Sequence, residues 1–286
     1  MWAVWAPPAR AFDQERAFVM LEAQCAFGPR NPNSEGHEAC LRFLERELRF
    51  WADTVWLQPF TYDSRHTGET LKLTNIIGQF RPSQPVRIAL AAHWDTRPMA
   101  DRDPNPENHN TPILGANDGA SGVAVLLEIA RQLDLQPPEV GVDILLFDGE
   151  DYGVEGVLED YTIGSHYYVR HLQGPAPRFG ILLDLIGDRD LRIPLEPHSQ
   201  RYAADVLLKV YDAADRVGAM SFVRETGPAV YDDHIPFLEA QIPFVDLIDF
   251  DYEFWHTVED VPKNCSAQSL GEVGRTVMEV LRNERP

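Results

Sequence analysis

Two adjacent carboxylates, Glu150 and Asp151, follow the apolar run "ILLF" at residues 144–147, which is typical of a buried strand. Like charges this close repel each other, and their burial costs several kcal/mol unless a positive charge neutralises them. A bound cation would supply that charge. The segment therefore indicates a metal site, in which one carboxylate can bind the ion while the other remains free to move a proton.

Other strand-like runs end in residues that can bind a metal. His93 and Asp95 stand in "AAHWD", Asp184 in "LLDLIGD", and His256 follows shortly after "FVDLID". In open α/β sheets, ligands bind outside the carboxyl ends of the strands, so these side chains are expected to converge. The two-residue period of a strand places His93 and Asp95 on one side, where the carboxylate can orient the imidazole.

Asp118 lies in "GANDGASG", at the start of a predicted helix where glycines allow a tight turn. Taken alone it is best interpreted as a capping residue. Together, imidazoles and carboxylates without thiolates suit zinc in a catalytic site. The histidines outside these runs are interpreted as ordinary polar residues: His37, His66, His109, His166, His171 and His198. The segment 153–161, with Glu155, Glu159 and Asp160, is interpreted as a solvated acidic loop.

Composition excludes several classes of protein. The 286 residues show no internal repeat or convincing linker, which favours a single domain over 1–286. The chain has 44% hydrophobic and 24% charged residues and no apolar run of the roughly 20 residues that a membrane helix needs. A formal charge of −20, from 45 acids and 25 bases, argues against a nucleic-acid partner.

Cysteine usage and the first residues leave the compartment open. Three cysteines cannot all pair within one chain; Cys25 and Cys40 can form a disulfide in an exported protein or remain buried thiols. The opening "MWAVWAPPARAFD" lacks the basic and apolar regions of a secretory signal but is compatible with the stub of a trimmed one. An exported or periplasmic protein is suspected, and a cytoplasmic one is not excluded.

Periodicity predicts alternating strands and helices. Helical spacing covers residues 12–27, 35–48 after the capping Ser34, 118–133, 162–172, 198–217 and 266–282. Strand-like runs cover 55–62, 73–80, 86–95, 142–150, 179–188 and 242–249. This order predicts an α/β fold, a three-layer α/β/α sandwich with a central mixed, mostly parallel sheet.

Six motifs in order carry a family resemblance: "HWD", "GANDGASG", "FDGED", "LLDLIGD", "DDHIPF" and "FWHTVED". They resemble the zinc exopeptidase family that contains the two-zinc aminopeptidases and the animal-type glutaminyl cyclases. The resemblance covers nearly the whole chain, and residues 12–37 look particularly like the cyclases. It is closest to a bacterial-like glutaminyl-peptide cyclotransferase.

The cyclase pattern implies one zinc ion, bound by Asp118, Asp151 and His256, with Glu150 as the proton shuttle. It further implies the roles of three pocket residues: Asp184 and Asp232 as hydrogen-bonded acids, and Trp255 as a wall of the substrate pocket. The reaction would convert an amino-terminal glutamine to pyroglutamate and release ammonia, so the implied partners are peptides or proteins with a free N-terminus. A monomer is expected.

The aminopeptidase pattern uses the same positions differently. Asp118 would bridge two zinc ions, with His93 and Asp184 completing one site and Asp151 and His256 the other. All five ligands are present, so ligand identity does not separate the two activities. The cyclase is preferred, a two-zinc aminopeptidase is the alternative, and a non-catalytic metal-binding or peptide-binding relative is disfavoured by the intact shuttle carboxylate.

The chain departs from the cyclase pattern at four positions. Asp151 stands where cyclases usually have glutamate, and Asp246, in "IPFVDLI", where they have histidine. The resemblance assigns Asp246 to the hydrogen-bond network around the substrate. Ala92 replaces a cysteine of the animal cyclases, and "GEDYGVEG" lacks the expected tryptophan.

Overall fold

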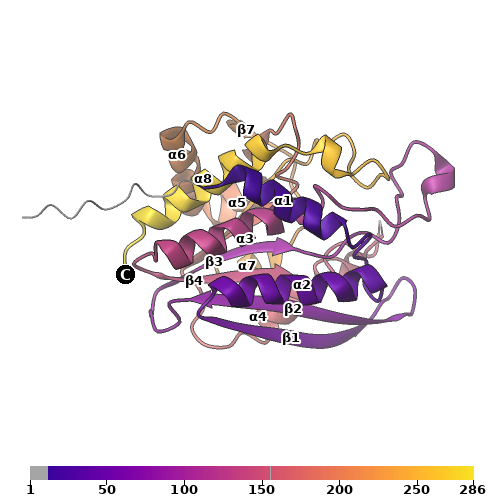
Figure 1. Cartoon of the computed structure of the whole chain (residues 1–286), viewed down its shortest axis with the longest axis horizontal. Coiled ribbons are helices and arrows are strands. Elements are labelled where there is room, and N and C mark those ends of the chain that lie inside the picture. The colour runs from indigo at the N-terminus through magenta and orange to yellow at the C-terminus, as the bar shows by residue number, and fades with distance from the viewer. Residues whose placement is uncertain (1–11, 155) are drawn as a thin grey trace, which may run out of the picture.

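A computed structural model describes residues 12–286 with the exception of residue 155. The expectation of a trimmed signal, which rests on the first residues, and the interpretation of Glu155 therefore fall outside the described residues. Figure 1 shows a twisted sheet with helices packed on both faces. The predicted α/β/α sandwich is confirmed.

The sheet has six strands in the order β1-β2-β4-β3-β5-β8. Their bounds are β1 Thr54–Asp63, β2 Thr70–Phe80, β3 Arg87–His93, β4 Gly141–Phe147, β5 Phe179–Asp184 and β8 Phe244–Ile248. β1 and β2 are antiparallel to their neighbours, whereas β4, β3, β5 and β8 run parallel. The sheet is mixed and mostly parallel, as predicted, and its four parallel strands end at one edge.

Strand residues alternate between two cores. On β3, Leu90 and Ala92 join the larger core, whereas Ala89 and Ala91 face the smaller one beside Phe237. The larger core lies under α1 Gln14–Cys25, α2 Glu35–Trp51, α3 Ala120–Leu135, α6 Ala204–Val217 and α8 Ala267–Asn283. The smaller core lies under α4 Ile163–Arg170 and α7 Ile235–Glu239. Burial on both faces explains why β3, β4 and β5 read as continuous apolar runs.

A local signal sets the start of α2. The side chain of Ser34 accepts a hydrogen bond from the backbone N–H of His37 at 3.1 Å, which confirms the predicted cap of α2.

Cys25 and Cys40 are both buried free thiols. Within the described residues, no helix is long and apolar enough to cross a membrane.

The prediction of one helix over 198–217 is wrong. The structure has α5 Pro197–Tyr202 and then α6, with Ala203 between them at φ −138° and ψ 34°. Glu196 caps α5 by accepting hydrogen bonds from the backbone N–H groups of His198 and Ser199. Two short strands, β6 Ile193–Leu195 and β7 Phe222–Thr226, form a separate parallel pair that sequence periodicity did not predict. Three and five residues are too few to establish a period.

Candidate active site and metal centre

The candidate ligands gather at the carboxyl edge of the parallel strands. His93 ends β3, Glu150 and Asp151 follow β4, and Asp184 ends β5. His256 lies in the loop after β8, and its φ of 55° shows that the backbone is turned into the left-handed region there. The strand ends therefore bring together residues that are far apart in the sequence, as expected.

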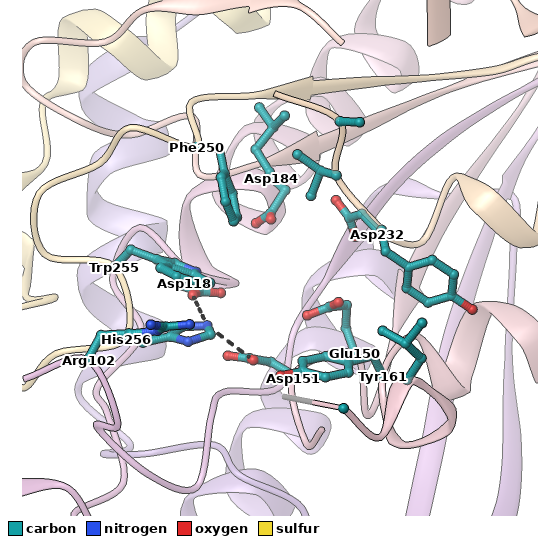
Figure 2. A pocket seen from close by; sticks show the side chains of 16 residues that line it. Arg102, Asp118, Glu150, Asp151, Tyr161, Asp184, Asp232, Phe250, Trp255 and His256 are labelled. Atoms are coloured by element: carbon teal, nitrogen blue, oxygen red, sulfur yellow. Dashed lines mark ion pairs between the residues drawn. The ribbon is translucent and has the colours of Figure 1, made fainter. Parts of the chain in front are cut away.

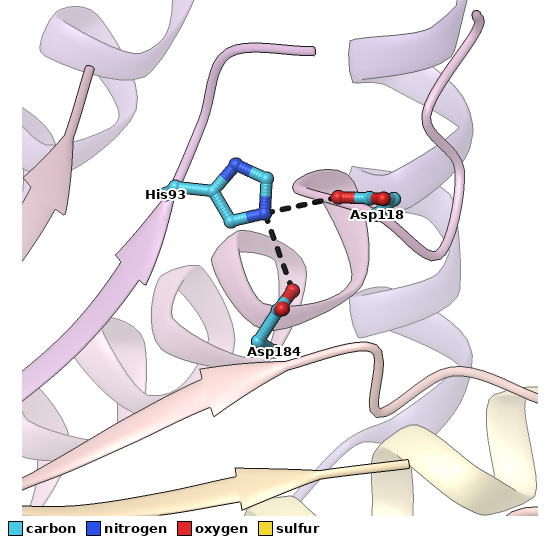
Figure 3. Close-up of side chains that lie close together, drawn as sticks. All are labelled: His93, Asp118 and Asp184. Atoms are coloured by element: carbon cyan, nitrogen blue, oxygen red, sulfur yellow. Dashed lines mark hydrogen bonds and ion pairs between the residues drawn. The ribbon is translucent and has the colours of Figure 1, made fainter. Parts of the chain in front are cut away.

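One ligand group consists of His93, Asp118 and Asp184 (Figure 3). The Nε2 atom of His93 lies 3.2 Å from Asp118 Oδ1 and 3.2 Å from Asp184 Oδ1. All three side chains are buried, and their ligand atoms lie within 4.8 Å of one another. This arrangement can enclose one metal ion.

A second group consists of Asp118, Asp151 and His256, also buried (Figure 2). The Nε2 atom of His256 lies 3.3 Å from Asp151 Oδ1 and 3.6 Å from Asp118 Oδ2. Asp118 thus presents one oxygen to each group. Burial and the neighbouring Asp151 charge raise the pKa of Asp118 to about 7, a cost that a bound cation would remove.

The turn at Asp118 depends on Gly119, which has a φ of 98°. A Cβ atom at this position would lie 2.6 Å from the backbone oxygen of Asp95. The carboxylate of Asp260 also fixes this turn, because it accepts hydrogen bonds from the backbone N–H groups of Asn117 at 2.8 Å and Asp118 at 3.1 Å. Because a Cβ atom at position 119 would meet the Asp95 backbone, glycine is required next to the shared ligand Asp118.

Asp95 supports the neighbouring ligands from behind. It lies 3.6 Å from the Nδ1 atom of His93, on the side where strand periodicity placed it. Its two oxygens accept hydrogen bonds from the backbone N–H groups of Glu150, at 3.1 Å, and Asp151, at 3.4 Å. The Asp95 carboxylate therefore lies beside the His93 imidazole and also holds the backbone at Glu150 and Asp151.

A buried guanidinium that the sequence analysis did not identify contacts the second ligand group. Arg97 donates to Asp151 Oδ1 at 2.8 Å and binds Asp101 through Nε and Nη2, both at 2.8 Å. Asp101 in turn lies 3.5 Å from the Nδ1 atom of His256. Burial by itself would raise the pKa of Asp151, but His256 and Arg97 outweigh it and the pKa is lowered. Asp151 is therefore held as a carboxylate.

Glu150 belongs to neither ligand group, although it lines the same pocket. Burial is the main cause that raises its pKa well above the ordinary value, and the charges of Asp232 and Asp151 add to it, while His93 opposes. A buried carboxylate beside a metal ligand but free of the metal is suited to accept and return a proton.

The pocket has a volume of about 270 Å³ and is lined by both polar and aromatic side chains. Trp255 stacks on His256, with ring centroids 3.8 Å apart and an interplanar angle of 29°, and Phe250 packs on Trp255 at 4.8 Å. These rings lie together at one side of the pocket (Figure 2). Asp184 lines the pocket next to Phe250, and Asp232 lines it across from Trp255 (Figure 2).

Asp246 does not line the pocket. It is fully buried on β8, where its Oδ2 atom lies 3.8 Å from the Nδ1 atom of His234, and neither of its oxygens has a hydrogen-bond partner among the described residues. Burial and the charge of Asp232 raise its pKa well above the ordinary value. The predicted role of Asp246 in the hydrogen-bond network around the substrate stays a prediction, and the structure places Asp246 beside the pocket residue Asp232.

The structure bears out one interpretation from the sequence and corrects another. His37 is a polar residue with a partner, as interpreted: it is buried, stacks on Trp94 and binds Asp148 at 2.8 Å. Asp160 is not solvated, because it is fully buried and accepts hydrogen bonds from Ser64 and from the hydroxyl of Tyr62. Period and composition cannot reveal such pairings between distant residues.

The donor set fits zinc. The Oδ2 atom of Asp151 is buried and has no hydrogen-bond partner among the described residues, so a metal ion would satisfy it. The ligands are imidazole nitrogens and carboxylate oxygens, the set found in catalytic zinc sites. An α/β sandwich with this set of imidazole and carboxylate ligands at the carboxyl edge of its parallel strands is the arrangement of a metalloenzyme.

Comparison with known proteins identifies the family. The sequence profile of Peptidase family M28 matches residues 75–281, and the chain belongs to this family. The chain is similar to a glutaminyl cyclase of Bacteroides thetaiotaomicron solved with N-acetylhistamine, at 41% identity, with a TM-score of 0.93 over 97% of this chain and 100% of that one. It is similar to a Zn-dependent exopeptidase of Parabacteroides distasonis at 37% identity, with a TM-score of 0.93 over 96% and 100% of the two chains. It is 26% identical to a glutaminyl-peptide cyclotransferase of Bos taurus, over 86% of this chain and 76% of that protein. These relatives support zinc as the metal.

Proposed function

We propose that the protein is a zinc-dependent glutaminyl-peptide cyclotransferase, which acts as a monomer on peptides or proteins with an amino-terminal glutamine. The observation that carries the proposal is the position of Glu150, buried in the pocket beside the ligand Asp151 but outside both ligand groups. Full-length similarity to a solved glutaminyl cyclase favours cyclisation among the reactions that such a site can perform.

Asp118, Asp151 and His256 would hold the catalytic zinc. When bound, the ion supplies Lewis-acid polarisation of the substrate's side-chain amide. Arg97 keeps Asp151 ionised and oriented, and Asp101 orients His256 from the other side. Asp151 and His256 are thus fixed by contacts behind them, which preserves the geometry while a substrate enters.

Glu150 carries the proton in the proposed reaction. The α-amine of the substrate attacks its own side-chain amide carbon, a ring C–N bond forms, and the bond to the amide nitrogen breaks. The Glu150 carboxylate accepts one proton from the attacking amine and returns it to the leaving nitrogen, which departs as ammonia. Because the attack is intramolecular, the protein mainly holds a near-attack geometry, and such proximity can contribute about 7 to 11 kcal/mol.

Three other pocket residues would position the substrate. Asp184 and Asp232 are acids that line the pocket, and burial and nearby carboxylates raise the pKa of Asp232 well above its ordinary value. A protonated acid there can donate a hydrogen bond toward Glu150 or the substrate. Trp255 offers a flat apolar face next to His256 for the glutamine side chain.

An aminopeptidase with two zinc ions is the second candidate, and one observation favours it. His93, Asp118 and Asp184 form a complete second ligand group that shares Asp118 with the first. In that reaction Glu150 would take a proton from water, which would then attack the first peptide bond.

Product analysis separates the two candidates. The protein is given a glutaminyl peptide and, in parallel, a leucyl amide substrate, and both ammonia and free amino acids are measured. We expect ammonia and a pyroglutamyl peptide from the first substrate and no release of leucine from the second. Free amino acids without lactam formation would overturn the proposal.

A further inference from the structure

A second hollow adjoins the active-site pocket and shares Leu158 and Tyr231 with it. We propose that this hollow binds the residues that follow the amino-terminal glutamine of a peptide substrate, and that it favours an aromatic or aliphatic side chain together with a carboxylate. Its volume is about 240 Å³. We call it the aromatic groove; its defining residues are Phe60, Tyr62, Arg65, Tyr167 and Arg170. The inference rests on the proposed function, because it assigns the peptide an orientation.

The groove presents stacked rings. Phe60 of β1 and Tyr167 of α4 are parallel, with centroids 4.1 Å apart and an interplanar angle of 6°, and His171 stacks on the other side of Tyr167 at 4.1 Å. Rings held in this way lose little conformational freedom when a ligand packs against them. The sheet edge and helix α4 therefore provide a rigid apolar surface.

The boundary between the two hollows is apolar and exposed. Leu158 is 53% exposed and Tyr231 is 37% exposed. The hydroxyl of Tyr231 lies 3.1 Å from the Nε2 atom of His166, a contact that holds the ring at this boundary. Exposed apolar side chains that connect a catalytic pocket to a groove are typical of a binding surface.

The connection between the pocket and the aromatic groove indicates that the groove binds the peptide chain that follows the first residue. A peptide bound with its first residue in the pocket must leave it by some route, and an extended chain advances about 3.3 Å per residue. A path over Leu158 and Tyr231 would place the second to fourth residues in the aromatic groove. A single amino acid amide cannot reach it, so the groove would distinguish peptides from small amides.

The basic side chains of the aromatic groove add a preference for a carboxylate in the substrate. Arg65 is 66% exposed at its side chain, and its ion pair with Glu159 is loose, at 3.9 Å. Arg170, which is exposed, lines the same hollow. The lining of the hollow has these two guanidinium groups and one carboxylate, Glu159, so it is locally positive in a chain whose formal charge is −20. They would attract a carboxylate in the second to fourth positions of the substrate.

Steady-state kinetics with three substrates test the inference. The substrates are glutaminyl-alanine amide, a tetrapeptide amide of glutamine followed by three alanines, and a tetrapeptide amide of glutamine, phenylalanine, glutamate and alanine. For the third we expect kcat/KM about tenfold higher than for the second, through a lower KM, because an aromatic contact and an ion pair together supply about 1.4 kcal/mol.

Two groove variants and one control locate the effect. Tyr167→Ala and the exposed Arg170→Glu should each lower the tenfold advantage to about threefold, because each removes one of the two contacts, and should leave kcat/KM for glutaminyl-alanine amide unchanged. Phe50→Ala, which removes a 74% exposed ring from α2, should change neither value. Equal kcat/KM for the two tetrapeptides, or an advantage that stays tenfold in both groove variants, would overturn the inference.

Failure of the groove and failure of the proposed function give different results. If glutaminyl-alanine amide is cyclised but the tetrapeptides do not differ, the function stands and the groove is wrong. If no substrate is cyclised, the function is wrong. The same three substrates then test the groove through release of free glutamine, where the same advantage and the same loss in the variants are expected.

Discussion

Arg97 and Asp151 form a buried ion pair, with Nη1 2.8 Å from Oδ1, and the second carboxylate oxygen of Asp151 has no hydrogen-bond partner among the described residues. One oxygen is thus held by the protein and the other is available to a metal ion. This division explains how an aspartate can act where the related cyclases usually have the longer glutamate. The guanidinium fixes the shorter side chain in place.

Loss of this ion pair should weaken zinc binding. We expect Arg97→Met to lower zinc affinity by about 10- to 100-fold, because contacts behind metal ligands contribute this much. Chelator competition on folded protein measures the affinity. Arg282→Met, an exposed site at the end of α8, serves as the control. Unchanged affinity in a folded Arg97→Met protein would show that Asp151 is positioned without the guanidinium.

Glu150→Gln should separate metal binding from turnover. Because Glu150 lies in neither ligand group, zinc content should stay at the wild-type level. The kcat should fall by about 10²- to 10⁴-fold, the usual contribution of a general acid or base. Metal analysis and kinetics on the same preparation check both values. Parallel loss of zinc and activity would identify Glu150 as a ligand.

Gly119 and Gly218 form a matched pair for a test of backbone strain. Both have positive φ values, 98° and 71°, but a Cβ at Gly119 would lie 2.6 Å from Asp95 O, whereas one at Gly218 meets nothing within 4 Å. Gly119→Ala should cost about 1 to 3 kcal/mol and also weaken zinc binding, because the turn presents Asp118. Gly218→Ala should cost about 1 kcal/mol and leave zinc unaffected. Urea unfolding and chelator competition measure these effects, and equal behaviour of the two variants would refute the role of the turn.

Glu196 should stabilise the fold at neutral pH, and this contribution should decrease at low pH. Burial opposes its ionisation, but His234 and the N–H groups of His198 and Ser199 outweigh this and lower its pKa from 4.5 to about 2. A lowered pKa stabilises the fold above the unfolded-state value, and this stabilisation is lost as the pH falls from 4.5 towards 2. At pH 7, Glu196→Gln should therefore be less stable by about 2 kcal/mol, after allowance for solvent screening. Urea unfolding at pH 7 and pH 4 should show a smaller difference at pH 4; a constant difference would exclude this linkage.

The sequence predicted the parts of the fold that have long, regular periods. The continuous apolar runs before His93 and Asp151 correspond to β3 and β4, and the five predicted metal ligands lie together because four parallel strands end at one edge. These are consequences of strand period and α/β topology, which are local or general properties.

Apart from Asp95, the residues that support the ligands were not predicted from the sequence. Arg97, Asp101 and Asp260 lie on loops, and their partners are distant in sequence or depend on how each loop returns. The break between α5 and α6 at Ala203 was likewise not predicted, because the helical spacing continues across it. No period marks such residues. A charged residue close to a ligand motif, such as Arg97 four residues after His93, was the only available signal.

The fate of the two substrate nitrogens tests cyclisation most directly. A glutaminyl peptide carrying ¹⁵N only in the side-chain amide is incubated with the protein, and ammonia and peptide are analysed by mass spectrometry. Cyclisation predicts that all of the label leaves as ammonia and that the peptide keeps its α-nitrogen in an unlabelled pyroglutamyl ring. Free glutamine that retains the label, with a shortened peptide, would contradict this account and establish hydrolysis of the first peptide bond.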